Sequence, residues 1–396
     1  MPETSSKRPT TPRSIRIALV VNPFTLRMKG GDHAPALARE FISRGHTVRG
    51  FGAPPGAIPR SSSDPIIEGG VATEDGLGLL GFQPDVIVAY DATSPAAWLG
   101  ARRARKLHVP LLLVEEGFPE VGHPVERMLR ASGRGLWGAY VRRTAFKVVA
   151  LDAVASAQAR REGFRADDIH VLPPGVDLTH YRPGLSSNLP FQHGIRGRIL
   201  LRVGQLQEGR DLDVLIEAFA RTVGKREDWS LVFAGTGSAR GRLRALVDRL
   251  GIGARVHWIA RPRREELPGL LGASTLLAIT ARDNDVRTLI ARRALACGLP
   301  VIASDVPRLR ELVEHDGCGL LATPSDIASW TATIQSAASS PMRRERWGLR
   351  GREIAEECFA WPQIADEFER SLLEAHASSL EGLPRGVVGS SSPSRI

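Results

Sequence analysis

The chain has 396 residues, of which 42% are hydrophobic and 24% are charged, a balance that suits two or three globular domains. No apolar run of about 18 residues is present, so we expect no transmembrane helix, and residues 1–14 lack the apolar segment of a secretory signal. The three cysteines, Cys297, Cys318 and Cys358, are too few and too scattered for a disulfide framework or a zinc site. We therefore expect a cytoplasmic protein.

The formal net charge is +10, which is compatible with nucleic acid, an anionic membrane surface or an acidic substrate as a partner. Most of the basic residues are arginines, a skew that GC-rich coding also produces, so the position of the charge is more informative than its total. The sequence contains no nucleic-acid recognition motif, and we expect no nucleic-acid partner.

The first half of the chain alternates apolar runs with helical patterns. A Ser/Thr/Pro/Arg-rich tail at 1–14, which we expect to be disordered, precedes an apolar run at 15–22 that is typical of a strand covered on both faces. Gly30 and Gly31 then open a helix, and the side chain of Asp32 can accept from the free amides of its first turn. Further strands are predicted at 47–51, 84–90, 109–114 and 148–151, with helices at 96–106 and 153–161.

Residues 126–147 carry six basic side chains and one acid, with Trp137, Tyr140 and Phe146 among them. An interfacial helix combines cations with aromatic rings in this way, so the segment is a candidate for contact with an anionic membrane surface. The protein would then be peripheral at the inner face of the membrane. An ordinary packing helix with a solvated basic face fits the same pattern, and the sequence leaves both interpretations open.

A Ser/Pro/Gly-rich stretch at 185–197 has the composition of a linker, and the alternation of strands and helices begins again after it. Strands are predicted at 198–203, 230–234, 276–280, 301–304 and 319–323, with helices from about 212, 238, 285, 327 and 362.

Strand–helix alternation on both sides of a linker predicts an α/β protein of two doubly wound, Rossmann-like domains that face a cleft. We place the N-terminal domain at 15–184 and the C-terminal domain at 198–360. A helix at 361–378 is expected to pack back on the N-terminal domain, and the tail at 379–396 is expected to be disordered.

Two phrases, ALACGLPVIASDVPRLRELV from residue 294 and VLPPGVDLTHYRPG at 171–184, closely resemble segments of the family 4 retaining glycosyltransferases of GT-B fold. The resemblance covers roughly residues 15–375 and is strongest in 199–325. It implies transfer of a hexosyl group, with retention, from a nucleotide-diphosphate sugar to a glycan, lipid or small-molecule acceptor. The sequence does not identify the sugar, the nucleotide or the acceptor.

The family carries an acidic residue followed, after seven others, by a glutamate before Ala-Met-Ala-Cys-Gly. The same spacing here gives Asp285 and Arg293, so the resemblance assigns both to the donor site but replaces one acid by a cation. An alignment with a two-residue insertion instead brings Asp283 and Asn284 to the first position. Arg293 has hydrogen-bond donors only, which favours an acidic donor group such as a uronic acid carboxylate or an additional phosphate. A surface arginine beside Arg292 is the alternative.

Two glycine loops complete the expected donor site. In the first, the resemblance puts Gln205 and Arg210 where the family usually has arginine and lysine, and we expect Arg210 to offset the charge of the leaving diphosphate. The glycines would let the backbone approach a ligand, although each loop also fits an ordinary strand-to-helix turn. The residues expected at the donor are Gly30, Gly31, Gly204, Gln205, Arg210, Gly235, Gly237, Asp285 and Arg293.

Glu116 and Asp285 are the candidate catalytic residues. Tyr90 and Glu116 end predicted strands where the family often carries histidines, so they could act as a base or hydrogen-bond donor, or could simply terminate buried strands. Residues 283–285 match an Asp-x-Asp metal pattern of transferases with another fold, which nothing else here resembles, so we expect no metal and no cofactor. The departures from the family leave a second hypothesis, a degenerate GT-B protein that binds a nucleotide sugar or glycan without turnover.

Overall fold

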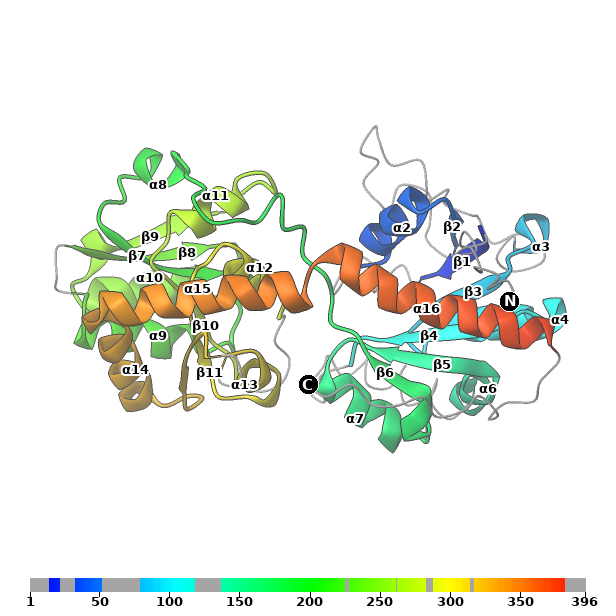
Figure 1. The fold of residues 1–396 in the computed structure, drawn as a ribbon. Helices are drawn as coiled ribbons and strands as arrows, with labels where there is room; N and C mark the ends of the chain where they lie inside the picture. The colour runs from blue at the N-terminus through cyan, green and yellow to red at the C-terminus, as the bar shows by residue number, and fades with distance from the viewer. Residues whose placement is uncertain are drawn as a thin grey trace, which may run out of the picture.

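The computed structural model describes residues 14–21, 33–51, 79–117, 137–224, 228–260, 262–282, 288–313 and 317–381. Most of the two predicted terminal tails lies outside these residues. The described chain forms two α/β domains, each built on a six-stranded parallel sheet, and the predicted fold class is confirmed (Figure 1). No helix within the described ranges is long and apolar enough to cross a bilayer.

The N-terminal sheet has the strand order β2-β1-β3-β4-β5-β6. Its strands are β1 (Arg16–Val20), β2 (Thr47–Phe51), β3 (Val86–Tyr90), β4 (Leu111–Glu115), β5 (Ala145–Ala150) and β6 (Ile169–Val171). Strand β3 shows why these segments are unbroken apolar runs: Val86 and Val88 enter one core, whereas Ile87 and Ala89 enter the core on the opposite face.

Helices cover both faces of this sheet. One face packs against α2 (His33–Ser43) and the C-terminal helix α16 (Trp361–Leu380). The other carries α3 (Leu79–Phe82), α4 (Pro95–Leu107), α6 (Ala139–Thr144) and α7 (Ala153–Arg161), and the short helix η2 (Ala166–Asp168) precedes β6. Ser94 caps α4 by accepting from the amide of Ala97 at 3.0 Å, and Asp152 caps α7 by accepting from that of Ala155 at 2.7 Å.

The basic aromatic segment predicted at 126–147 is not one continuous helix. In its described part, α6 ends at Thr144, and Phe146 and Lys147 lie in strand β5. Trp137 packs beside Trp98 of α4 with 6.4 Å between ring centroids, and the Tyr140 ring lies 5.4 Å from the guanidinium of Arg105. The rings of the described part therefore pack against the domain's own helices.

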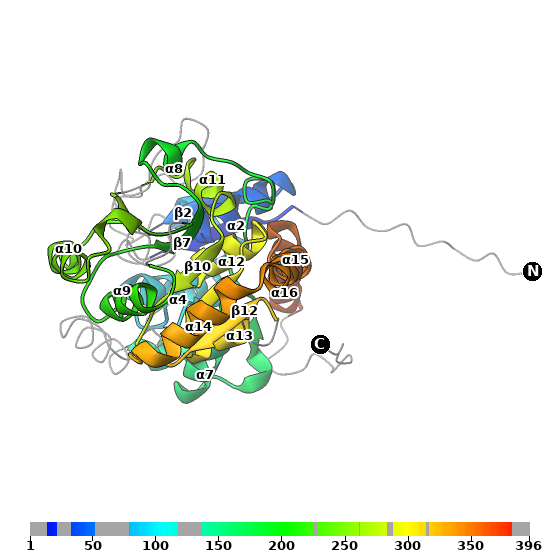
Figure 2. The same ribbon diagram turned by 90° about the vertical axis from the view of Figure 1, so that its left-hand side faces the viewer.

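The C-terminal sheet has the strand order β12-β11-β10-β7-β8-β9. Its strands are β7 (Arg198–Val203), β8 (Trp229–Ala234), β9 (Val256–Ile259), β10 (Leu276–Ile279), β11 (Val301–Ser304) and β12 (Gly319–Ala322). One face packs against α11 (Leu267–Gly272), α12 (Leu289–Ala296) and α13 (Pro307–Val313), and the other against α9 (Leu212–Arg221), α10 (Arg240–Arg249) and α14 (Ile327–Ser339). Figure 2 shows this domain towards the viewer, with the sheet between the two helical layers. The short helices α8 (Leu189–Gln192), inside the predicted linker, and η3 (Gly253–Arg255) complete it.

The chain passes between the domains twice, after β6 and between α15 (Pro341–Cys358) and α16. The two crossings touch, because the amide of Val176 donates to the carbonyl of Phe359 at 2.6 Å. Gly175 lies against the indole of Trp361, where an added Cβ would stand 2.5 Å from a ring carbon, so only glycine fits. Helices α15 and α16 run end to end along both domains (Figure 1).

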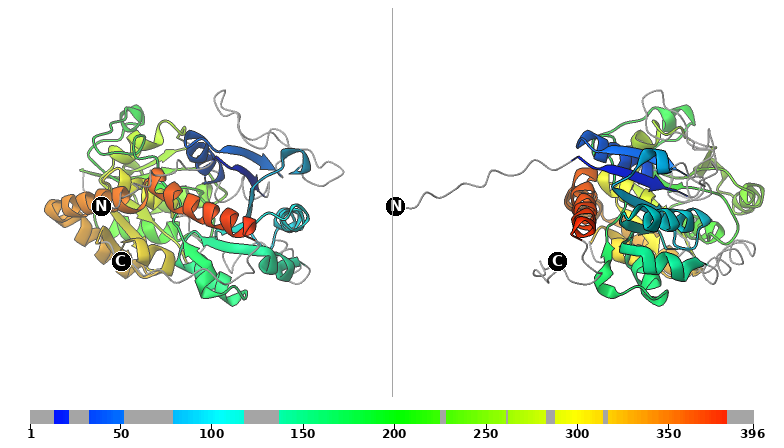
Figure 3. Two further views of the ribbon diagram at one scale, coloured as in Figure 1. Left: turned by 45° about the vertical axis from the view of Figure 1, so that its right-hand side comes forward. Right: turned by 90° about the vertical axis from the view of Figure 1, so that its right-hand side faces the viewer.

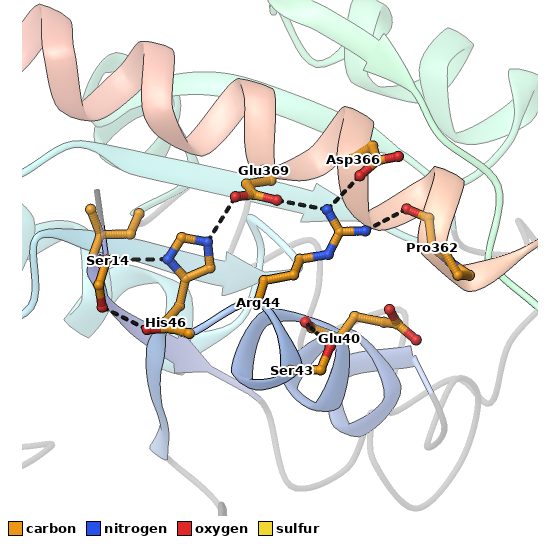
Figure 4. Close-up of polar contacts among 10 residues, drawn as sticks. Ser14, Glu40, Ser43, Arg44, His46, Pro362, Asp366 and Glu369 are labelled. Carbon is orange, nitrogen blue, oxygen red and sulfur yellow. Dashed lines mark hydrogen bonds and ion pairs between the residues drawn. The ribbon is translucent and has the colours of Figure 1, made fainter. Parts of the chain in front are cut away.

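Helix α16 follows the C-terminal domain in sequence but packs on the N-terminal domain (Figure 3). Its apolar stripe enters the core beneath α2 and consists of Ile364, Phe368, Leu372 and Ala375. Polar contacts hold another side of α16 to the N-terminal domain. Arg44 donates to Asp366, Glu369 and the carbonyl of Pro362 (Figure 4). His46 Nε2 lies 3.0 Å from Glu369 Oε1. These contacts make α16 part of the N-terminal domain.

Candidate functional site

Each sheet changes its winding direction at its first strand. Strand β1 lies between β2 and β3, and β7 lies between β10 and β8, so both sheets have a topological switch point beside these strands. In open α/β sheets, ligands bind at the carboxyl end of the strands at such a point. Arg308, just after β11, contacts Glu116 and Gly117, just after β4, so the carboxyl edges of the two sheets face each other.

Two glycine loops meet at the carboxyl edge of β7 and β8. Gly204 has a φ of +128°, and Cβ atoms at Gly235 and Gly237 would lie 2.0 Å from the carbonyl oxygen of Gly204 and 2.1 Å from that of Leu206. The amide of Leu206 donates to the carbonyl of Thr236 at 2.9 Å, which locks the loops together. Gly235 and Gly237 are therefore required by the contact between the loops, a reason the sequence did not reveal.

Arg202 is a cation of this edge that the sequence analysis missed, because it lies inside the apolar run of β7. Its side chain is buried, its Nη1 donates to the carbonyl of Val203 at 2.9 Å, and it fills the space next to Gly204. Burial, and then the positive charge of Arg210, lowers the pKa of Arg202 to about 10. Arg210 is thus close enough to add its charge to that of Arg202, whereas Gln205 is exposed.

Asp211 holds the neighbouring loops in place. It stands in the left-handed region, with φ +51°, directly before α9, and its carboxylate is buried. The amide of Ser325, after β12, donates to this carboxylate at 2.8 Å, and Arg282, after β10, forms an ion pair with it. Loops from three strands are thereby fixed around the carboxyl edge of the C-terminal sheet.

Arg308 crosses from the C-terminal to the N-terminal domain. Its Nε lies 2.9 Å from Asp152 Oδ2, and its Nη2 donates to the carbonyls of Glu116 and Gly117 at 2.9 and 3.0 Å. Both side chains of the ion pair are at most one-tenth exposed. The structure therefore shows a role for the backbone of Glu116 at this contact, while its side chain is half-buried.

Tyr90 shares a hydrogen bond of 3.0 Å with Nδ1 of His33, at the start of α2. Burial, and then the charge of Glu116, raises the pKa of Tyr90 well above its usual value, so its hydroxyl stays protonated at neutral pH. Burial, and then the charge of Arg292, lowers the pKa of His33 to about 4, so the imidazole is neutral. This pair offers hydrogen bonding rather than charge.

Glu115 and Asp91 form a buried acidic pair beside Tyr90. Glu115 Oε1 accepts from the amide of Ala92 at 2.9 Å, and Asp91 has a φ of +64°. Burial, and then the charge of Asp91, raises the pKa of Glu115 well above its usual value. Glu115 is buried and its carboxyl already accepts from a backbone amide, whereas Glu116 is half-buried, so Glu116 remains the more accessible candidate of the two neighbours.

The adjacent arginines of α12 have different surroundings. The guanidinium of Arg293 lies 5.1 Å from the ring centroid of Tyr181, in the segment that joins the domains. Arg292 is buried, lies 5.3 Å from the ring of Phe359, and faces His33 closely enough to lower its pKa. Of these two arginines, Arg292 faces His33 of the N-terminal domain, whereas Arg293 faces the segment that joins the domains.

Residues 31–180 match the family described as Glycosyltransferase Family 4, and residues 187–354 match the family described as Glycosyl transferases group 1. Each half of the chain is therefore similar to a glycosyltransferase family. The resemblance predicted for both halves is thus supported by independent matches to each of them.

Named relatives agree with these matches. D-inositol 3-phosphate glycosyltransferase of Rhodococcus jostii (strain RHA1) is 32% identical over 226 residues, which are 55% of this chain and 49% of the relative. A protein of the same name from Xylanimonas cellulosilytica is 27% identical over 321 residues, 74% of this chain and 72% of the relative. The chain therefore spans about half the length of the Rhodococcus relative that it matches.

Solved structures share the arrangement of the two domains. The Anabaena protein HepE, solved in complex with UDP, superposes with a TM-score of 0.75 over 91% of this chain and 100% of its own, at 20% sequence identity. At this identity the likeness shows the fold, which is GT-B.

Several predicted site residues lie outside the described residues: Gly30, Gly31, Asp285 and the Asp-x-Asp segment 283–285. The structure brings Gly204, Arg210, Gly235 and Gly237 together at one edge of the C-terminal domain. It adds Arg202 at this edge. A second group of charged or polar residues lies where the two domains meet and consists of Arg292, Arg308, His33 and Asp152. Most of the added residues could not be found by motif, because they lie within apolar runs or beside the motif positions.

Proposed function

We propose that the chain is a retaining glycosyltransferase that moves a hexosyl group from a nucleotide-diphosphate sugar to an acceptor. The observation that carries the proposal is the buried Arg202 beside Arg210 at the switch point of the C-terminal sheet. Two cations at the carboxyl edge of a parallel sheet suit a diphosphate, which carries negative charge and many acceptor oxygens. The domain matches, and the UDP and UDP-glucose in the HepE structures, support a uridine nucleotide as the first donor to test.

Catalysis in this proposal rests on charge and position. As the bond between sugar and diphosphate breaks, negative charge grows on the leaving phosphate, and fixed guanidinium groups stabilise it more than they stabilise the bound donor. Asp285 would hold hydroxyls of the sugar, and the Glu116 carboxylate would accept the proton of the acceptor hydroxyl. Relatives named for D-inositol 3-phosphate make a phosphorylated cyclitol an acceptor to test.

A transfer assay with UDP-hexoses and a panel of acceptors tests the proposal. Arg202→Met and Arg210→Ala should each lower kcat about a hundredfold, because each removes a cation from the leaving group. The control is Arg350→Met, which removes an exposed cation that pairs with Glu353 on α15. Retention requires that the product keep the anomeric configuration of the donor, which proton NMR reads directly. Unchanged kcat in both site variants would refute the placement of the diphosphate.

A catalytically inactive binder is the second candidate, and Arg293 is the observation that favours it. The family position that carries a glutamate here carries a cation that lies over Tyr181. Calorimetry separates the two functions. A binder would take up a UDP-sugar while release of UDP stays at the background rate for every donor and acceptor, whereas a transferase would release UDP only when the acceptor is present.

A location at an anionic membrane surface is a further part of the proposal, based on the basic segment 126–147. Since Trp137 and Tyr140 pack inward, attraction would rest on arginine charge rather than on aromatic insertion. The protein should therefore sediment with anionic liposomes at low salt and be released at high salt. Sedimentation that does not depend on lipid charge would exclude this attraction.

A further inference from the structure

Arg292 is a buried cation with an incomplete set of partners. Its side chain is 5% exposed on α12, and its guanidinium lies over the ring of Phe359. Nη1 donates to the hydroxyl of Thr288 at 2.9 Å, but Nε has no hydrogen-bond partner. Among the described residues, no carboxylate lies within ion-pair distance of Arg292. A guanidinium has five N–H donors, so most of its hydrogen-bonding capacity is unused.

The groups around Arg292 do not neutralise it. His33, across the domain interface, is neutral, because burial and the arginine charge lower its pKa to about 4. Asp152 is the acid whose charge acts most strongly on Arg292, but Arg308 already forms an ion pair with it at 2.9 Å. Glu311 is exposed to solvent, which screens its charge. The buried groups at this point of the domain interface therefore carry an excess positive charge.

Retaining such a cation is unfavourable unless something compensates it. An unpaired buried charge costs several kcal/mol, and proteins usually neutralise or pair it. Burial lowers the pKa of Arg292 to about 10, yet the group remains charged at neutral pH. The Phe359 ring is a favourable surface for this cation, as the Tyr181 ring is for Arg293, but it leaves Nε of Arg292 without a hydrogen-bond partner. A role in the ligand-free fold alone does not explain Arg292.

We propose that Arg292, with Arg308 beside it, binds one oxyanion of a substrate, a phosphate monoester or a carboxylate, where the two domains meet. The planar fork of Arg292 would bind two oxygens of this group, and the N–H of its unpartnered Nε is one of the available donors. The inference rests on the proposed function, because the anion would belong to the sugar donor or to the acceptor. It transfers to Arg292 the preference for an acidic group that the sequence assigned to Arg293.

Calorimetric titration of inorganic phosphate into the full chain tests the site. The measurement is made at about pH 7.5, where His33 is neutral, and with UDP present so that phosphate does not compete for the diphosphate site. Arg292→Lys keeps the charge but loses the fork, and should weaken phosphate binding about tenfold. Arg292→Met should abolish measurable binding. Arg350→Met, which removes an exposed cation of α15, should bind phosphate like the wild type.

Thermal unfolding separates a binding role from a structural one. If the charge of Arg292 is compensated only by a bound anion, Arg292→Met removes an uncompensated buried charge. Without phosphate, this variant should then unfold at a higher temperature than the wild type. Phosphate should raise the Tm of the wild type but not that of the variant. Equal phosphate affinity in the wild type and Arg292→Lys, or a rise in Tm with phosphate in Arg292→Met, would overturn the proposal. UDP binding, measured in the same variants, reports separately on the proposed donor site.

Two further titrations identify which substrate carries the anion. In the first, the wild type and Arg292→Lys are compared for UDP-glucuronate against UDP-glucose. In the second, with UDP bound, they are compared for an inositol phosphate against inositol. If Arg292→Lys loses the preference of the wild type for UDP-glucuronate, the anion belongs to the donor. If it loses the preference for the inositol phosphate, the anion belongs to the acceptor. No lost preference in either titration would refute a substrate role for Arg292.

Discussion

Gly237 and Gly241 lie four residues apart, yet a methyl group should have opposite effects at the two positions. At Gly237 a Cβ would stand 2.1 Å from the carbonyl oxygen of Leu206, so the two loops would have to separate. At Gly241, in α10, nothing lies within 4 Å. We expect Gly237→Ala to lower the free energy of unfolding by about 2–4 kcal/mol. Gly241→Ala should raise it by up to about 1 kcal/mol, because alanine favours the helix.

Chemical denaturation of both variants checks this pair. Because Gly237 belongs to the proposed donor site, UDP affinity should fall with Gly237→Ala and stay constant with Gly241→Ala. If Gly237→Ala were as stable as the wild type, the contact between the loops would be looser than the structure shows.

Single residues of the site differ in how far the sequence can predict them. Arg210 could be predicted because it occupies a motif position. Arg202 could not, because a single arginine within an apolar strand carries no motif. Arg292 and Arg293 are adjacent, and successive side chains of a helix point about 100° apart. Only the packing of α12 against the N-terminal domain decides which of the two faces His33. Motif spacing identified the helix but could not show which of its two arginines faces the N-terminal domain.

Among the elements, strand β4 ends in the buried Glu115, and this carboxyl should make stability depend on pH. Its folded pKa is raised by burial and by Asp91, so the folded state binds its proton more tightly than the unfolded state. The associated stability is complete below the unfolded pKa of about 4.5 and is lost as the pH rises towards the folded pKa. Each pH unit in that window removes at most about 1.4 kcal/mol.

Glu115→Gln tests this dependence, since glutamine can still accept from the amide of Ala92. The variant should gain stability relative to the wild type as the pH rises from about 6.5, above the range in which His33 titrates, towards the folded pKa of Glu115. Unfolding in urea at several pH values gives the difference, and Glu353→Gln, at an exposed carboxylate, is the control. If the free energies of unfolding of Glu115→Gln and the wild type differed by the same amount at every pH in this range, Glu115 would already be ionised in the folded protein.

The same scale shows why the strands were predictable and some boundaries were not. All five residues of β3 and of β4 are buried, and such runs stand out in a sequence. The junction of α6 and β5 could not be predicted from the sequence. The aromatic and basic pattern before Thr144 continues through Phe146 and Lys147 without a turn signal. Helix α8 was missed because four residues inside a Ser/Pro/Gly-rich stretch give no periodicity.

At the scale of the whole molecule, the side chain of Arg308 links the two domains. It leaves the C-terminal domain at the start of α13 and ends in the N-terminal domain on Asp152 and the carbonyls of Glu116 and Gly117. Covalent connection is confined to the two crossings near Val176 and Phe359, which touch each other and leave a narrow hinge. The ion pair is therefore placed to hold the facing sheet edges together.

Arg308→Met should shift the ligand-free protein towards more open arrangements, because breaking a buried pair leaves Asp152 without its partner. Small-angle scattering should show a larger radius of gyration than in the wild type. Arg310→Met, three residues before the end of the same helix, is the control, since Arg310 pairs with Asp305 inside its own domain.

A double-mutant cycle with Asp152→Asn isolates the pair, because asparagine keeps the acceptor that caps α7. Arg308→Met and Asp152→Asn should be non-additive by about 1–3 kcal/mol in the free energy of unfolding. The effect on scattering should also be smaller when Arg308→Met is introduced into Asp152→Asn, since the link is already weakened there. Additive free energies together with an unchanged radius of gyration would show that the domains are held by the hinge alone. In that case Arg308 would only fill the space between Glu116 and Asp152.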